Sequence, residues 1–258
     1  MQIDRKKVMK TFQDYVDNYN SEDEKVRLKI EHTYRVSELC ESIAQSLRLD
    51  TEECSLAWLL GMLHDIGRFE QLKNYGTFID ARSIDHALYG AEILFEQGGI
   101  RAYLEDAEED KLLRTAVAFH SAYRLPEGMD KRTKMFCQIL RDADKIDILK
   151  ANVDFPIEEI YNVSTEELRA AKVSEAVMEA FTEGHAVLRS LKKTPVDHVV
   201  GHISLVYELV YPKSLMIVRE QGYVQKLMNF QSENLKTQRQ FDQIRKKMNA
   251  YLQGEADR

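Results

Sequence analysis

Histidine and aspartate side chains gather in the first 150 residues of the chain. Four of the seven histidines lie there, each at the end of a helical pattern or in a break between patterns. Imidazole and carboxylate groups are the ligands of zinc, iron and manganese in proteins. The candidate ligands could hold one ion or two; they are His32, His64, Asp65, His86, His120 and Asp144, with Asp142 and Asp147 as rivals of the last.

The dipeptide His64-Asp65 ends an apolar run in the stretch AWLLGMLHDIGRFE, residues 57–70. Consecutive residues of an α-helix point about 100° apart, so both side chains reach one ion only where the helix is ending. We expect Gly67 to supply that ending. A carboxylate in this place can also bridge two metal ions, which lets the pair share a nucleophilic hydroxide.

Apolar residues recur at helical spacing along most of the chain, which predicts an all-α fold. The apolar run predicts a buried helix from Thr51 to about Ile66, capped at its start by the segment that begins with Asp50. Residues 71–84 lack periodicity and predict a loop, and no segment alternates as a half-buried strand does. Further helices are predicted over residues 3–20, 22–49, 85–95, 108–122, 131–150, 165–191, 196–211 and 213–251.

The predicted domain organisation has three parts. Residues 1–25 form an N-terminal helix that packs on the core, residues 26–150 form the core that carries the candidate ligands, and residues 151–258 form a C-terminal helical extension. Because no linker separates these parts, we expect them to share one compact domain.

Composition excludes several classes of protein. A net charge of −7 argues against a broad surface for duplex nucleic acid, which needs clustered lysine and arginine. The three cysteines, Cys40, Cys54 and Cys137, show no zinc or disulfide spacing and are expected to be reduced core residues. The first residues lack the apolar run that a signal peptide requires, and no apolar run has membrane-spanning length, so we expect a cytoplasmic protein. The sequence leaves the oligomeric state open.

The ordered histidines and aspartates resemble the HD superfamily of metal-dependent phosphohydrolases, in the variant with two extra histidines between the HD pair and the last aspartate. The segments that surround the candidate ligands also resemble the family over residues 26–150. These segments are LAWLLGMLHDIGR, SIDHALYGAEIL, LLRTAVAFHSAYRLPEG and ILRDADKIDIL. The resemblance implies a helical bundle of the HD-domain type.

The resemblance also implies a ligand set for two divalent ions. The first ion would be held by His32, His64, Asp65 and Asp144. The second would be completed by His86 and His120, with Asp65 as the bridge. Iron, manganese or zinc would suit such ligands, and magnesium, cobalt or nickel are further candidates.

The implied activity is hydrolysis of a phosphate ester of a nucleotide or other small phosphorylated metabolite by a metal-bound hydroxide. Asp65 and Arg68 are the candidate catalytic residues. A guanidinium can grip a phosphate with two hydrogen bonds, so Arg68 is also a candidate for binding substrate, and Lys145 could act there as a point charge. Residues 71–84 join the HD pair to His86, so this loop could overhang the metals or be a solvent-facing connector.

Two alternatives remain open from the sequence. The same six-ligand pattern resembles a branch of HD proteins that use a di-iron centre to activate oxygen, although a basic residue at Arg68 favours a hydrolase. The other alternative is a non-catalytic sensor that binds a nucleotide and transmits the signal through residues 151–258.

Overall fold

The computed structural model describes residues 3–161 and 163–254, in which helices joined by loops form the regular structure and no β-strand occurs. The predicted all-α class is confirmed. The chain divides into two compact units, Met1–Asp144 and Lys145–Arg258, each described here by itself. Whether the two units act as one domain stays a prediction. Among the described residues, no helix combines the length and the apolar character needed to cross a bilayer.

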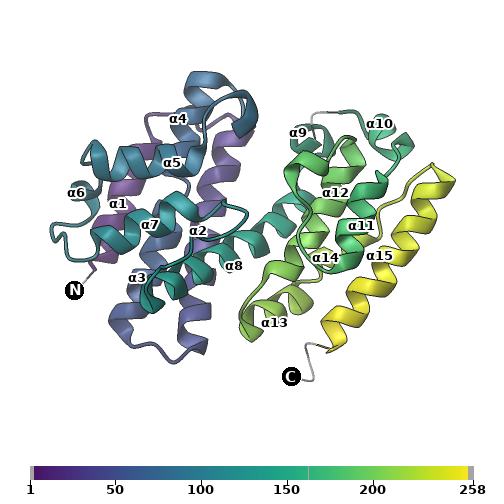
Figure 1. The fold of residues 1–258 in the computed structure, drawn as a ribbon. Helices are drawn as coiled ribbons and strands as arrows, with labels where there is room; N and C mark the ends of the chain where they lie inside the picture. The colour runs from purple at the N-terminus through teal and green to yellow at the C-terminus, as the bar shows by residue number, and fades with distance from the viewer. Residues whose placement is uncertain (1–2, 162, 255–258) are drawn as a thin grey trace. The chain divides into compact units, whose positions relative to one another are not determined.

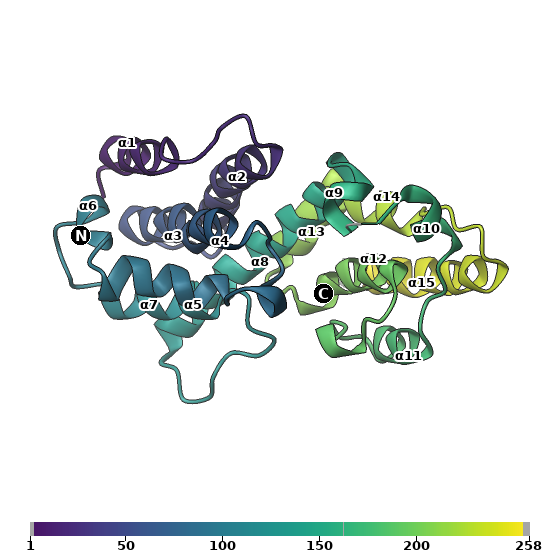
Figure 2. The ribbon, with the colours of Figure 1, turned by 90° about the horizontal axis from the view of Figure 1, so that it is seen from above.

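The first unit contains the candidate ligands. Its long helices run side by side, and Figure 2 shows α3 between α2 and α7, in keeping with the contacts of α3 with both. The described elements are α1 (Arg5–Val16), α2 (Glu24–Ser46), α3 (Thr51–Leu63), α4 (Ile66–Tyr75), the 3₁₀ turn η1 (Asp80–Arg82), α5 (His86–Ala91), the π-helical turn η2 (Glu92–Glu96), α6 (Ile100–Tyr103), α7 (Asp110–Phe119) and the start of α8 (Lys131–Asp154).

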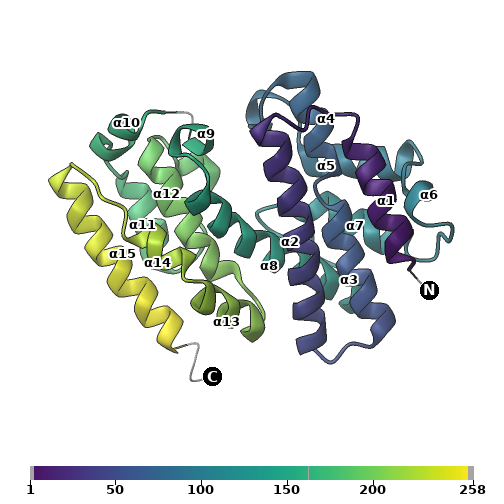
Figure 3. The ribbon, with the colours of Figure 1, turned by 180° about the vertical axis from the view of Figure 1, so that it is seen from behind.

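The second unit begins within α8. Helix α12 contacts α10, α11 and α14, and α15 lies along α11 and α14, as Figures 1 and 3 show. Its elements are α9 (Ile157–Tyr161), α10 (Thr165–Ala170), α11 (Glu175–Glu183), η3 (Arg189–Leu191), α12 (Pro195–Ser204), η4 (Leu205–Glu208), α13 (Pro212–Gln221), α14 (Tyr223–Met228) and α15 (Leu235–Gly254).

Helix α3 is the buried centre of the first unit. It begins at Thr51 as predicted, because the Asp50 carboxylate accepts a hydrogen bond from the backbone N–H of Glu53. Every residue from Leu56 to Leu63 is buried. At Gly61 the helix touches α2 so closely that a Cβ would lie 2.3 Å from the Cα of Ser37. This contact fixes α3 against the helix that carries His32.

Gly67 does not end the helix, contrary to the sequence prediction. Helix α3 stops at Leu63, the chain turns at Asp65 (φ −105°, ψ 16°), and Gly67 lies inside the following helix α4. A Cβ at Gly67 would lie 2.2 Å from the carbonyl oxygen of His86 and 2.6 Å from the backbone nitrogen of Gly90. The glycine is therefore needed for the close approach of α5 to α4.

Two other sequence predictions need correction. The predicted loop 71–84 is shorter, because α4 continues to Tyr75 before Gly76 ends it in the left-handed conformation (φ 65°). The long helices predicted over 165–191 and 213–251 are each divided into shorter helices. The three cysteines are buried and unpaired, as expected.

Candidate metal centre

The histidine of the HD pair is oriented by the end of its own helix. His64 follows the last residue of α3, and its Nδ1 lies 2.7 Å from the carbonyl oxygen of Gly61. A carbonyl oxygen only accepts hydrogen bonds, so Nδ1 carries the proton and the neutral ring has a lone pair on Nε2. Helix α7 repeats this arrangement, with Nδ1 of His120 at 2.7 Å from the carbonyl oxygen of Val117.

The other ligands come from three further helices. His32 lies on α2, His86 is the first residue of α5, and Asp144 lies on α8. The four histidines of the cluster are buried, and Asp65 is buried as well. Asp144 Oδ1 lies 3.2 Å from Nε2 of His32 and 3.9 Å from Nε2 of His64. The structure thus brings together all six residues proposed from the sequence.

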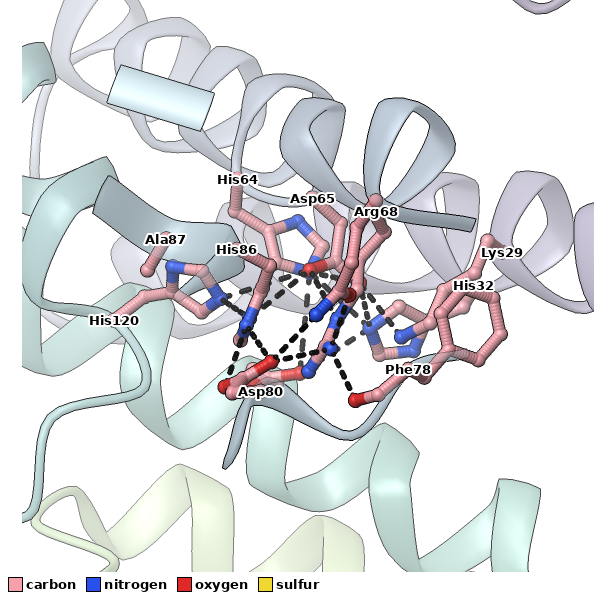
Figure 4. Close-up of polar contacts among 12 residues, drawn as sticks. Lys29, His32, His64, Asp65, Arg68, Phe78, Asp80, His86, Ala87 and His120 are labelled. Carbon is pink, nitrogen blue, oxygen red and sulfur yellow. Dashed lines mark hydrogen bonds and ion pairs between the residues drawn. The ribbon is translucent and has the colours of Figure 1, made fainter. Parts of the chain in front are cut away.

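Asp65 lies between two pairs of histidines, and each of its carboxylate oxygens faces one pair (Figure 4). Oδ2 is 3.5 Å from Nε2 of both His32 and His64. Oδ1 is 3.6 Å from Nε2 of His86 and 3.7 Å from Nε2 of His120. One carboxylate can therefore contribute a different oxygen to each of two neighbouring ions.

The hydrogen-bonding pattern fits a cation. The Nε2 atoms of His86 and His120 lie 3.1 Å apart, and so do those of His32 and His64. Because Nδ1 of His64, His86 and His120 each faces an acceptor, their Nε2 lone pairs point at one another and at the carboxylates. Acceptors that converge in a buried site need a cation or a proton between them. Two overlapping groups of these ligands have the spacing of a metal site, namely His32, His64 and Asp144, and His64, Asp65 and His120.

The environment keeps the histidines neutral and the carboxylates charged. Burial lowers the pKa of His64 to about 3, and burial together with the charge of Arg68 lowers the pKa of His86 to about 4. Burial alone would raise the pKa of Asp65, but the nearby Lys29 and His64 outweigh it and hold that pKa well below its usual value. Neutral imidazole and ionised carboxylate are the forms that bind metal ions.

Lys29 is a site residue that the sequence analysis missed. Its Nζ donates a hydrogen bond to Oδ2 of Asp65 at 2.7 Å and lies 5.5 Å from the centroid of the Phe78 ring. Lys29 precedes His32 by three residues on α2, which places both on one face of the helix. That spacing was the signal in the sequence that could have revealed it.

Arg68 lies in the first turn of α4, next to the Asp65 carboxylate (Figure 4). Its Nη1 donates to Asp80 Oδ1, to Gln71 Oε1 and to the carbonyl oxygen of Phe78, at 2.7–2.8 Å. Its Nε is buried, has no hydrogen-bond partner among the described residues, and lies 3.7 Å from Oδ1 of Asp65. One edge of the guanidinium is therefore anchored while a second donor remains available beside the cluster.

The loop between α4 and α5 contributes Phe78 and Asp80 to this site (Figure 4). The sequence analysis named the loop without these residues. Asp80 could have been suspected from its place six residues before His86, but a carboxylate in an irregular segment is a weak signal. Lys145 is buried on α8, as the first residue of the second unit, and its role as a substrate ligand stays a prediction.

Comparison with known families agrees with this geometry. The family model for the HD domain matches residues 30–152, a range that contains all six candidate ligands. The match identifies residues 30–152, a little under half of the chain, as an HD domain. The HD superfamily consists largely of metal-dependent phosphohydrolases, and the buried histidines and aspartates of this HD domain suit a divalent metal. Neither the curated proteins nor the solved structures include a match to the chain.

Proposed function

We propose that this HD domain is a phosphohydrolase that uses two divalent ions to cleave a phosphate ester of a nucleotide or another small phosphorylated metabolite. The position of Asp65, with one oxygen toward each histidine pair, is the observation on which the proposal rests. His32, His64 and Asp144 would hold one ion with Asp65, and His86 and His120 would hold the other with it. Bound divalent ions would activate water and neutralise charge that develops on the phosphoryl oxygens.

The side chains beside Asp65 suit an anionic substrate. Lys29 and Arg68 both contact Asp65, and both lie near the Phe78 ring, at 5.5 and 5.7 Å from its centroid. Lys29 Nζ now bonds to an oxygen that would be a metal ligand, so ion binding would weaken that bond and leave an ammonium for the substrate phosphate. The unpartnered Nε of Arg68 would donate to a second phosphate oxygen.

The test is a substrate screen on protein purified without chelator. Metal content is measured by inductively coupled plasma mass spectrometry, and the protein is assayed with Mn²⁺, Fe²⁺, Co²⁺ or Mg²⁺ against phosphomonoesters, cyclic dinucleotides and dinucleoside polyphosphates. Turnover with at least one ester is expected. Absence of turnover with every ion would contradict the proposal.

Two variants make the screen specific to the proposed site. His64→Ala and Asp65→Ala should each lose metal and turnover together, because each removes a ligand from the cluster. His185→Ala is the matched control, since His185 is a histidine of the second unit that hydrogen-bonds to Glu183. The control should keep wild-type metal content. Oxygen consumption by the iron-loaded protein, without ester cleavage, would instead favour the oxygenase alternative.

A further inference from the structure

Asp80 is the residue through which a proposed metal ligand and a proposed phosphate ligand are connected. Its carboxylate is 10% exposed and lies 3.0 Å, by either oxygen, from Nδ1 of His86. Oδ1 also accepts hydrogen bonds from Arg68 Nη1 at 2.8 Å and from Gln71 Nε2 at 3.0 Å. A single carboxylate therefore orients an imidazole and a guanidinium at once (Figure 4).

We propose that Asp80 is a positioning residue. It orients His86 toward the second metal ion and at the same time holds Arg68 so that its Nε can bind phosphate. The metal half of this proposal needs only ion binding by His86, whereas the Arg68 half rests on the proposed phosphohydrolase function. Asp80 contacts His86 at Nδ1, whereas Nε2 is the nitrogen near Asp65 and His120, so Asp80 acts on the cluster through its two partners.

The contact with His86 fixes which ring nitrogen is available. An ionised carboxylate only accepts, so Nδ1 of His86 donates to Asp80 and Nε2 keeps its lone pair toward Asp65 and His120. His64 and His120 obtain the same orientation from backbone carbonyl groups of their own helices. A carboxylate partner orients the ring in the same way, and its negative charge also makes the imidazole a more basic ligand.

The contact with Arg68 holds Nη1 and leaves the Nε donor beside the cluster. Three acceptors hold Nη1, namely Asp80, Gln71 and the Phe78 carbonyl group. The guanidinium plane is therefore fixed while the buried Nε lies beside Asp65 Oδ1. Without the Asp80 charge, the guanidinium would lose its one anionic partner in the loop and could turn toward the Asp65 carboxylate.

Gln71 makes the position of Asp80 rigid. This fully buried side chain of α4 donates through Nε2 to Asp80, to Ser83 Oγ at 2.8 Å and to the carbonyl oxygen of Ile84 at 2.9 Å. The loop that carries Asp80 is thus tied to the same helix as Arg68. This connection lets a loop side chain orient metal and substrate ligands with helix-like precision.

The experiment compares Asp80→Asn with Asp85→Asn by calorimetric titration of metal-free protein with Mn²⁺ and with Zn²⁺. For Asp80→Asn we expect the second ion to bind about 10–100-fold more weakly, while the first ion changes by less than about threefold. Asp85 lies in the same loop but caps α5 through the backbone N–H groups of Ala87 and Leu88. Asparagine caps equally well, so this control should bind both ions as the wild type does.

Arg68→Met separates the two halves of the proposal. It should leave the affinity for both ions within about threefold of wild type and raise KM for the ester found in the screen. Asp80→Asn should weaken binding of the second ion and also raise KM. If Asp80→Asn binds the second ion as tightly as wild type does, the positioning role is overturned. If Asp80→Asn loses the second ion and the wild type hydrolyses no ester, the role of Asp80 toward His86 is supported and the proposed phosphohydrolase function is contradicted.

A measurement on the wild-type protein covers the case in which Asp80→Asn fails to fold. Long-range ¹H–¹⁵N NMR of the metal-free protein, with His86 assigned by comparison with His86→Gln, reports which ring nitrogen carries the proton. We expect the Nδ1–H form at pH 7.5. The Nε2–H form would overturn the proposal, because His86 would then present a donor to the metal cluster.

Discussion

The Nε2 atoms of His86 and His120 lie 3.1 Å apart, and in the neutral rings neither of them carries a proton. Each ring donates its Nδ1 proton elsewhere, to the carboxylate of Asp80 or to the carbonyl group of Val117. Two lone pairs at this distance repel unless a positive charge lies between them. A bound cation would therefore stabilise the buried cluster.

Metal ions should stabilise the first unit against unfolding. An ion at 100 times its dissociation constant adds about 2.7 kcal/mol to the free energy of unfolding. For a protein of this size that gain corresponds to a rise of about 5–10 °C in Tm. Differential scanning calorimetry with Mn²⁺ and with EDTA measures the difference. Asp65→Ala is the control and should melt at the same temperature in both buffers. A wild-type Tm that is equal with Mn²⁺ and with EDTA would contradict the cation site.

Lys29→Met should impair substrate binding and spare the metal. Loss of one charge-assisted hydrogen bond to phosphate costs about 1.5–3 kcal/mol, which corresponds to a rise in KM of roughly 10–100-fold. Metal content should stay at the wild-type level because Lys29 donates to Asp65 and is no metal ligand. Lys25→Met, one turn earlier on α2, is the matched control for steady-state kinetics. Equal metal loss in Lys29→Met and Asp65→Ala would show that Lys29 is structural.

Gly67→Ala should destabilise the first unit more than Gly90→Ala. A Cβ at Gly67 would meet backbone atoms of α5 at 2.2 and 2.6 Å, whereas a Cβ at Gly90 would lie no closer than 3.1 Å to its neighbours. Backbone atoms of packed helices cannot yield as a side chain does, so we expect a loss of about 2–3 kcal/mol for Gly67→Ala. Urea unfolding followed by circular dichroism gives both values. The reverse order would refute the close contact between α4 and α5.

Lys192→Met should stabilise the second unit at neutral pH. Burial, with a contribution from Arg189, lowers the pKa of Lys192 to about 8 from its usual 10.5. Between these two values the unfolded chain binds the proton and the folded chain does not, so wild-type stability rises with pH through this window. At pH 7 the buried charge is a cost, and its removal should add about 1–3 kcal/mol to the free energy of unfolding.

The pH dependence of this difference is the control for Lys192. The stability advantage of Lys192→Met in urea unfolding should shrink as the pH rises from 8 to 10, because the wild-type lysine becomes neutral in the folded state. An advantage that stays constant over this range would mean that the variant acts through packing against Gly201, which the lysine side chain covers.

Local signals explain what could be predicted from the sequence. The start of α3 was predictable because Asp50 caps it, and α12 and α13 begin at Pro195 and Pro212, where proline is favoured. Gly222 separates α13 from α14 with a φ of 69°, which periodicity alone did not reveal. The ordered histidines and aspartates were found because each lies at a recognisable place in a helical pattern.

The missed features depend on contacts between distant segments. Gly67 was predicted to end a helix because glycine often does, whereas its role depends on α5, about twenty residues later in the chain. Asp80 lies in a segment without periodicity, so only the folded positions of His86, Arg68 and Gln71 show what it does. Such residues become visible when the hydrogen bonds of the first ligands are followed outward.

We propose that Asp65 bridges two metal ions. A crystal structure of protein purified without chelator, with anomalous scattering recorded at the absorption edges of the candidate metals, tests it most directly. We expect two ions, one among His32, His64 and Asp144 and the other at His86 and His120, with one oxygen of Asp65 bound to each. A single ion, with His86 and His120 turned away from it, would contradict the claim.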